Sequence, residues 1–131
     1  MSEEQPKSRF DSQVTLEELR ARIQKFAEER DWDQFHTPRN LLLAMMGEVG
    51  EVCEILQWKE TVSPGTPELS EEERVHLGEE LSDVLIYLIR LSDRCGIDLP
   101  SAAIRKMGLN AKKYPADVVR GSSKKYNEYH S

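Results

Sequence analysis

Two pairs of acidic residues in this sequence could do chemistry together. Glu48 and Glu51 are three positions apart, as are Glu80 and Asp83, so each pair occupies neighbouring turns of one helix face. A buried carboxylate is costly unless it is paired or binds a cation, and crowded like charges resist ionisation. If the two pairs converge, a divalent cation removes the conflict. Oxygen ligands favour Mg²⁺, with Mn²⁺ as a possible substitute, and Mg²⁺ commonly shares the oxygens of a phosphorylated substrate, which indicates phosphoryl chemistry.

The first pair lies in the stretch LLLAMMGEVGEVCEILQW, residues 41–58, whose pattern predicts a helix. With about 100° between successive residues, Glu48 falls inside the apolar arc and Glu51 at its edge. Glu54 falls on the opposite side, where it can meet water. The arc consists of Leu41, Met45, Val52, Ile55 and Leu56. The sequence therefore predicts that Glu48 and Glu51, but not Glu54, face the core.

The second pair lies in a longer predicted helix. A capping box at Ser70–Glu73 starts this helix, and Gly96 can end it. Glu80 lies at the border of the apolar arc, with Asp83 one turn further on and Tyr87 projecting nearby. The predicted arc is Leu77, Leu81, Val84, Leu85, Leu88 and Leu91. If the two helices pack side by side, four carboxylates meet.

Two further helices complete the predicted fold. A capping box at Thr15–Glu18 begins a helix that continues to about Arg30. Thr37 before Pro38 is a favourable start for the helix that carries Glu48. A fourth helix begins near Asp98 and stops at residues 114–115, where Tyr precedes Pro. No strand-like alternation of any length occurs, so we predict an all-α fold, a four-helix bundle.

The predicted domain organisation follows from these elements. Residues 1–14 read as a flexible N-terminal arm, residues 15–115 as one domain and residues 116–131 as a polar C-terminal tail. The chain has 131 residues and 38% hydrophobic content, which suits one modest core that pairing with further copies would extend.

Charge and cysteine content narrow the partners and the compartment. The net charge of −6 opposes non-specific binding to nucleic acid or to anionic membranes, so we expect neither as a partner. Cys53 and Cys95 form no C-x-x-C pair, which suggests reduced thiols, and the N-terminus lacks the pattern of a signal peptide. We expect a cytoplasmic protein, with nuclear or organellar residence also compatible.

Two other interpretations stay open from the residues alone. Acidic pairs three residues apart are common on solvated helices, so the chain could be a non-enzymatic helical interaction module. A third interpretation uses Glu73 and His76, whose spacing occurs in di-iron carboxylate bundles, although such bundles carry two copies of that motif.

Longer strings make the sequence similar to a known family. GEVGEVCEILQWK, EELSDVLIYLI and FAEERDWDQFHTPRNLLLA, with the Lys106, Asn110 and Lys113 block, resemble the all-α MazG-type nucleoside triphosphate pyrophosphohydrolases. The resemblance runs from Leu16 to about Tyr126 and is strongest to the branch that acts on dCTP. It implies Mg²⁺-dependent hydrolysis of a deoxynucleoside triphosphate, dCTP or a 5-modified dCTP, to the monophosphate and pyrophosphate. Nucleotide-pool control or cleansing would be the role.

The resemblance also implies roles for individual residues. Glu48, Glu51, Glu80 and Asp83 would be the catalytic metal ligands. Phosphate oxygens would be held by Lys106, Asn110 and Lys113, the last standing where the family often has Arg. For the base and sugar, the candidates are Trp32, His36, Trp58 and Tyr87. Ile23 departs from relatives that have a histidine near the base. A homodimer or homotetramer, built as a dimer of dimers, is expected.

Overall fold

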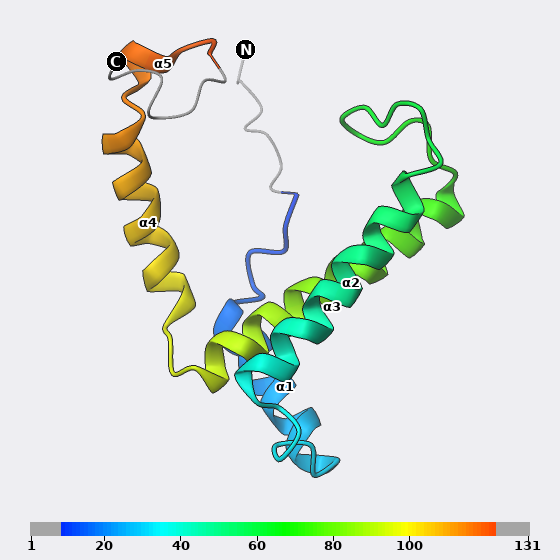
Figure 1. The fold of residues 1–131 in the computed structure, drawn as a ribbon, viewed down its shortest axis with the longest axis vertical. Helices are drawn as coiled ribbons and strands as arrows, with labels where there is room; N and C mark the ends of the chain where they lie inside the picture. Colours follow the sequence, from blue (N-terminus) through cyan, green and yellow to red (C-terminus); the bar gives the residue numbers. More distant parts are fainter. Residues whose placement is uncertain (1–8, 123–131) are drawn as a thin grey trace. The chain divides into compact units, whose positions relative to one another are not determined.

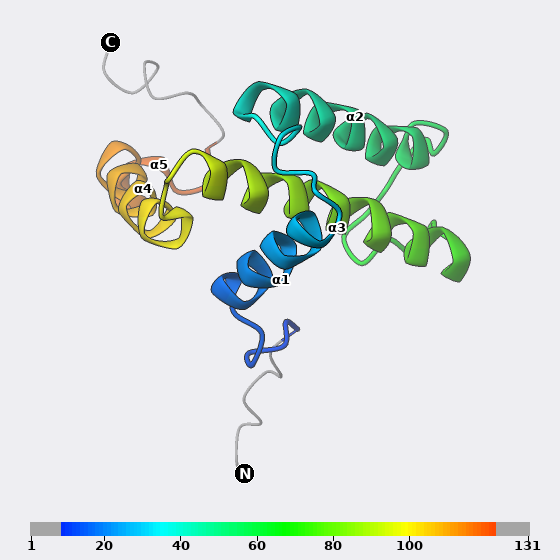
Figure 2. The same cartoon turned by 90° about the horizontal axis from the view of Figure 1, so that it is seen from below.

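The computed structural model describes residues 9–122, and within them the chain is helical with no strand. It divides into two compact units, Met1–Gly96 and Ile97–Ser131. The described residues form five helices, whose arrangement can be followed in Figures 1 and 2. These are α1 (Leu16–Glu29), α2 (Pro38–Leu56), α3 (Glu71–Arg94), α4 (Leu99–Lys113) and α5 (Ala116–Val119). The four long helices confirm the predicted all-α class. The short α5 was not predicted, because four residues are too few for a periodic pattern.

Polar side chains at the predicted positions begin the helices. Thr15 accepts the Glu18 N–H at 3.0 Å, and Thr37 accepts the Asn40 N–H at 3.3 Å. Among the helices of residues 9–122, only α3 has a complete capping box, in which the Ser70 hydroxyl accepts the Glu73 N–H and the Glu73 carboxylate accepts the Ser70 N–H. A capping box was also predicted for α1 at Thr15–Glu18, but there the Glu18 carboxylate pairs with Arg22 at 2.8 Å.

The first unit is organised around α3. The helices α2 and α3 run antiparallel and side by side, joined by the loop of residues 57–70, and α1 packs on another side of α3 (Figure 2). Gly96 follows α3 with a φ of 68°, a left-handed conformation that suits glycine and ends the helix as predicted. The long hairpin of α2 and α3 therefore carries both acidic pairs on facing helices.

The predicted apolar arc of α3 is only partly buried. Leu77, Val84 and Leu91 are partly buried, whereas Leu81 is 51% exposed and Leu85 and Leu88 are also exposed. Ile89, which the predicted arc omitted, is buried instead. The expectation for Leu81, Leu85 and Leu88 was wrong for the single chain, because α1 and α2 cover only part of the circumference of α3. On α2, Leu41 is buried as predicted.

The second unit contains α4 and α5. Asp98 caps α4, with its carboxylate accepting the Ser101 N–H at 3.2 Å, and Tyr114 ends the helix before Pro115. Every residue from Pro100 to Lys113 is exposed within the chain. The division after Gly96 falls inside the span 15–115 that was expected to form one domain, and that expectation stays a prediction.

Two of the compositional expectations can be compared with the structure. Cys53 and Cys95 are free thiols. Both side chains are exposed. Among the described helices, none has the length and apolar content needed to cross a membrane.

Candidate active site

Three carboxylates converge between α2 and α3. One oxygen from each of Glu48, Glu80 and Asp83 lies within 4.8 Å of the others, and all three residues are partly buried. Glu48 comes from α2 and the other two from α3, so the antiparallel packing of these helices creates the cluster. Glu51 is exposed and lies outside this set, although it is close enough to Glu80 to interact with it. The structure thus brings together three of the four predicted ligands and places the fourth at their border.

The oxygens of this cluster fit a cation. Glu48 Oε2 and Glu80 Oε2 are buried, and neither accepts a hydrogen bond from any residue of the described chain. A buried carboxylate oxygen without a donor is unfavourable, since nothing replaces its lost hydration. A divalent cation coordinated by carboxylate oxygens supplies the missing positive charge. The donor set therefore fits a hard divalent metal ion.

The electrostatics within the cluster also favours a bound cation. Burial raises the pKa of Glu48 above its ordinary value, and the nearby charges of Glu51 and Asp83 raise it further. The pKa of Glu51 is also raised, chiefly by the adjacent Glu80 carboxylate. Both shifts mean that the folded chain opposes full ionisation of the cluster. A cation would reverse this preference by stabilising the ionised forms.

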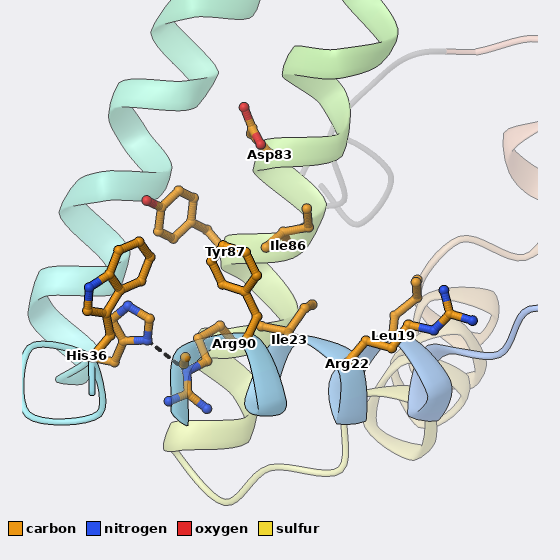
Figure 3. Close-up of a pocket in the computed structure, with 11 residues that line it drawn as sticks. Leu19, Arg22, Ile23, His36, Asp83, Ile86, Tyr87 and Arg90 are labelled. Atoms are coloured by element: carbon orange, nitrogen blue, oxygen red, sulfur yellow. Dashed lines mark hydrogen bonds between the residues drawn. The ribbon is translucent and has the colours of Figure 1, made fainter. Parts of the chain in front are cut away.

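A largely apolar pocket adjoins the cluster. It has a volume of about 430 Å³, and Asp83 belongs to both the cluster and the pocket wall (Figure 3). Three predicted base- or sugar-binding residues, Trp32, His36 and Tyr87, line it. The other lining residues are Leu19, Arg22, Ile23, Phe26, Ala27, Ile86 and Arg90. An aromatic, apolar pocket next to a cation site can accept a flat ring attached to an anionic group.

A tight turn after α1 positions the aromatic residues of this pocket. Asp31 has a φ of 54°, which reverses the chain so that the Trp32 N–H donates to the Ala27 carbonyl at 2.9 Å. The indole of Trp32 then lies edge-on to Phe26, with 5.7 Å between ring centroids, and 6.0 Å from the ring of His36. The irregular connection between α1 and α2 therefore forms one wall of the pocket.

Sequence reasoning missed the residue that holds this wall. Arg90 lines the pocket and is only 1% exposed, and it was not among the predicted site residues. A signal was present, since Arg90 follows Asp83 by seven positions and Tyr87 by three, which places all three on one face of α3. A charged residue on the face that carries predicted site residues is worth testing for such a role.

The structure places Trp58 away from the apolar pocket. Its side chain is 83% exposed and lines a second, more polar hollow that also contains Glu51, Glu80 and His76. Trp58 and Trp32 are thus on two different hollows of the same unit, and acidic residues border each of them.

The three predicted phosphate-binding residues are on α4, in the second unit. Lys106, Asn110 and Lys113 are separated by four and then three positions, which gives them a common face of that helix. All three are exposed, and the Lys113 ammonium lies 5.8 Å from the centre of the Tyr114 ring.

Glu73 and His76, the residues of the di-iron alternative, have other partners. The Glu73 carboxylate accepts the Ser70 N–H at 3.0 Å and pairs with Lys59 at 3.2 Å. These hydrogen bonds lower the pKa of Glu73, with the Ser70 backbone N–H as the largest cause. His76 Nε2 lies 3.3 Å from a Glu80 oxygen. Glu73 thus works as a helix cap.

The chain is similar in sequence and in fold to known proteins. The chain is 55% identical to human dCTP pyrophosphatase 1 over 119 residues, which cover 91% of this chain and 70% of that protein. It is 53% identical to the mouse protein of the same name over 120 residues, covering 92% and 71%. A pyrophosphatase from Archaeoglobus fulgidus DSM 4304, known from its crystal structure, is 40% identical, with a TM-score of 0.69. That match covers 76% of this chain and 92% of the archaeal one.

A family model gives the assignment. Residues 45–129 match the model of the MazG-like family, a span that includes both acidic pairs and the whole of α4. The predicted resemblance is therefore confirmed at the level of the family. The chain belongs to the MazG-like family.

Proposed function

We propose that this protein is a nucleoside triphosphate pyrophosphohydrolase that converts dCTP, or a 5-modified dCTP, to the monophosphate and pyrophosphate. Relatives that are 53 to 55% identical over most of the chain are named dCTP pyrophosphatase 1. The observation that carries the proposal from the structure is the double role of Asp83, which belongs to both the acidic cluster and the wall of the aromatic pocket. A triphosphate bound at the cluster would have its nucleoside within reach of that pocket.

The metal in this proposal is Mg²⁺, with Mn²⁺ as a substitute. Mg²⁺ bound at the cluster would neutralise triphosphate charge and lower the pKa of a water molecule that attacks phosphorus. Glu48, Glu80 and Asp83 would hold it, and Glu51 would join them from the edge. The buried, donor-free oxygens of Glu48 and Glu80 support this assignment. In this proposal the four carboxylates would hold the cation, and through it they would orient the reacting phosphate.

Base and sugar would occupy the apolar pocket. Trp32 offers an aromatic face, His36 a polar ring edge, and Tyr87 a ring one turn from Asp83 that would pack on the sugar and disfavour a 2′-hydroxyl. Ile23 adds an apolar contact to the pocket wall. Trp58, on the second hollow, is the further candidate for stacking.

The exposed polar face of α4 would bind phosphate. Lys106 and Lys113 would supply positive charge and Asn110 hydrogen bonds to the phosphate oxygens. Their common face on α4 supports this grouping.

We further propose a homodimer or a dimer of dimers. Large apolar side chains on both helices of the hairpin are exposed in the single chain, among them Leu42, Leu43, Met46, Leu81 and Leu85. Exposed apolar patches of this kind are typical of interfaces between subunits.

We also propose that the protein resides in the cytoplasm, which agrees with the free thiols of Cys53 and Cys95. We further propose that residues 15–115 act as one domain.

Product analysis tests the proposed function. The chain is incubated with Mg²⁺ and with dCTP, 5-methyl-dCTP, dUTP, dTTP or CTP, and the products are separated by ion exchange. We expect dCTP and its 5-methyl form to give monophosphate and pyrophosphate at the highest rates. Release of orthophosphate alone would contradict the proposal, as would full activity of a Glu48→Gln, Glu80→Gln double variant. Glu79→Gln is the matched control, since Glu79 is exposed on α3 beside Glu80.

A further inference from the structure

Arg90 is a buried cation with a partner at every nitrogen of its guanidinium. Its Nε donates to His36 Nδ1 at 2.9 Å, one terminal nitrogen donates to Asp33 Oδ1 at 2.6 Å, and the other donates to Gln24 Oε1. Asp93, one turn along α3, lies 3.8 Å from the guanidinium. Gln24 belongs to α1, and Asp33 and His36 belong to the connection between α1 and α2. One side chain of α3 therefore joins two other segments of the unit.

The bond to His36 determines which ring nitrogen carries the proton. An arginine Nε always bears hydrogen in proteins and only donates, so His36 Nδ1 must accept with its lone pair (Figure 3). A neutral imidazole with an acceptor at Nδ1 carries its hydrogen at Nε2. No residue of the span 9–122 forms a hydrogen bond with that Nε2. His36 lines the pocket, so this N–H is available to a ligand.

Partial burial and the neighbouring arginines keep the His36 ring neutral. Arg90 and Arg94 both disfavour a second proton on His36, whereas Asp33 favours one. Partial burial is the largest cause of the lowered pKa of His36, followed by the charge of Arg90. Near neutral pH the His36 ring is therefore uncharged and has one N–H donor instead of two.

We propose that Arg90 is a positioning residue for substrate selection, which holds His36 as the Nε2–H tautomer so that the pocket offers one fixed donor to a hydrogen-bond acceptor on the pyrimidine edge. Cytosine presents such acceptors at O2 and N3. The substrate part of this inference rests on the proposed function, whereas the tautomer part does not.

Arg94 provides the matched control. It lies one turn beyond Arg90 and holds the same connection, but through backbone carbonyls: its Nε donates to His36 O at 3.0 Å, and a terminal nitrogen donates to Asp33 O at 3.3 Å. Replacing Arg94 removes support from the connection and leaves the imidazole bond in place. Both arginines support the connection, whereas the contact that fixes the tautomer belongs to Arg90 alone.

The first experiment measures the tautomer in the full chain by long-range ¹H–¹⁵N correlation, with the His36 signals assigned from a His36→Phe variant. We expect the Nε2–H pattern in the wild type and in Arg94→Met, and a mixture of tautomers in Arg90→Met. An Nδ1–H ring in the wild type would overturn the inference, even if Arg90→Met failed to fold. Because no substrate is present, this result is independent of the enzymatic activity.

The second experiment is a kinetic cycle with dCTP. We expect Arg90→Met and His36→Phe each to raise KM by about 3- to 10-fold, the range for one hydrogen bond, with kcat changed much less. Because Arg90 acts through His36, the double variant should have the KM of His36→Phe alone. Multiplying effects in the double variant, or the same rise in Arg94→Met, would overturn the inference. If the wild type hydrolyses no dCTP, the proposed function fails while the tautomer measurement still stands.

Discussion

Two charged clusters on α3, one around Asp83 and one around Arg90, differ in whether their buried charges have partners within the chain. The acidic cluster gathers three carboxylates and leaves two buried oxygens without a donor among the described residues. The arginine cluster buries one guanidinium and gives each of its nitrogens an acceptor. Asp83 and Arg90 are seven residues apart on the same face of one helix, and both line the same pocket.

The difference separates a ligand site from a scaffold. A buried charge whose partners are all present stabilises the arrangement around it once the fold has formed. A group of like charges without a counter-charge destabilises the free protein, and a cation that neutralises the group is bound more tightly for that reason. The acidic cluster should therefore tolerate neutralisation without loss of stability but not without loss of activity, and the arginine cluster should respond mainly in stability.

The largest effect is expected from Asp83→Asn. It removes a ligand from the acidic cluster and a charge from the pocket wall, so kcat/KM for dCTP should fall at least about 100-fold, which is typical for loss of one electrostatic contact to a reacting group. The midpoint of urea unfolding of the metal-free protein should not decrease. Comparable kcat/KM values for Asp83→Asn and for the control Glu79→Gln would contradict the claim that the acidic cluster is needed for activity.

Arg90→Met should show the reverse pattern in stability. It leaves Gln24, Asp33 and His36 without their donor, and we expect the free energy of unfolding to fall by about 3 kcal/mol. Urea denaturation followed by circular dichroism measures this change. Arg94→Met, at an exposed position, should cost less than about 1 kcal/mol. Equal losses of unfolding free energy in Arg90→Met and Arg94→Met would contradict the claim that the buried Arg90 stabilises the fold more than the exposed Arg94.

The acidic cluster should also make the stability of the protein depend on pH. The pKa of Glu48 is raised above 4.5, so its contribution to the stability of the metal-free protein is present below that value and is lost as pH rises through the raised pKa. Glu48→Gln should remove this loss and raise Tm by a few degrees near neutral pH. The difference between the wild-type and Glu48→Gln unfolding curves isolates this group from carboxylates with lowered pKa, such as Glu73.

Saturating Mg²⁺ should reverse the difference in stability between the wild type and Glu48→Gln. The ion binds the ionised cluster, so the wild type should gain stability as pH rises, and Glu48→Gln should gain less. Uniform destabilisation by neutralising any of the four carboxylates in the metal-free protein would argue against mutual repulsion.

The smallest effect is expected at Trp58. Its side chain is 83% exposed, so Trp58→Ala should change the free energy of unfolding by less than about 0.5 kcal/mol. If the indole stacks on the substrate, KM should rise by about 5-fold or more, the scale of one base–aromatic contact. Steady-state kinetics with dCTP measures this. An unchanged KM would restrict base recognition to the pocket that contains Trp32.

Local features of the fold were predictable, and features that depend on packing were not. The starts of α1, α2, α3 and α4 follow from single capping residues, and the end of α3 follows from Gly96, because each is fixed by the neighbouring backbone. The approach of Glu48 to Glu80 was predictable because helix periodicity put Glu48 inside one apolar arc and Glu80 at the border of another.

The arginine cluster lay beyond sequence reasoning for a physical reason. Which residue of α3 meets the α1–α2 connection depends on how α1 packs against α3, and no local pattern encodes that contact. The exposure of Leu81, Leu85 and Leu88 has the same origin, since periodicity defines an apolar face but not the partner that covers it. The short α5 lacks the length that would reveal a period.

Direct cation binding tests the central claim, that the carboxylates of α2 and α3 form a metal site. Mn²⁺ is titrated into the metal-free protein and followed by electron paramagnetic resonance, with Glu80→Gln as the test variant and Glu79→Gln as its neighbour control. The account predicts saturable binding that Mg²⁺ competes away, with at least 10-fold weaker affinity in Glu80→Gln (about the effect of one lost ligand) and unchanged affinity in Glu79→Gln. Equal Mn²⁺ affinity in the three proteins, or no saturable binding in the wild type, would contradict it.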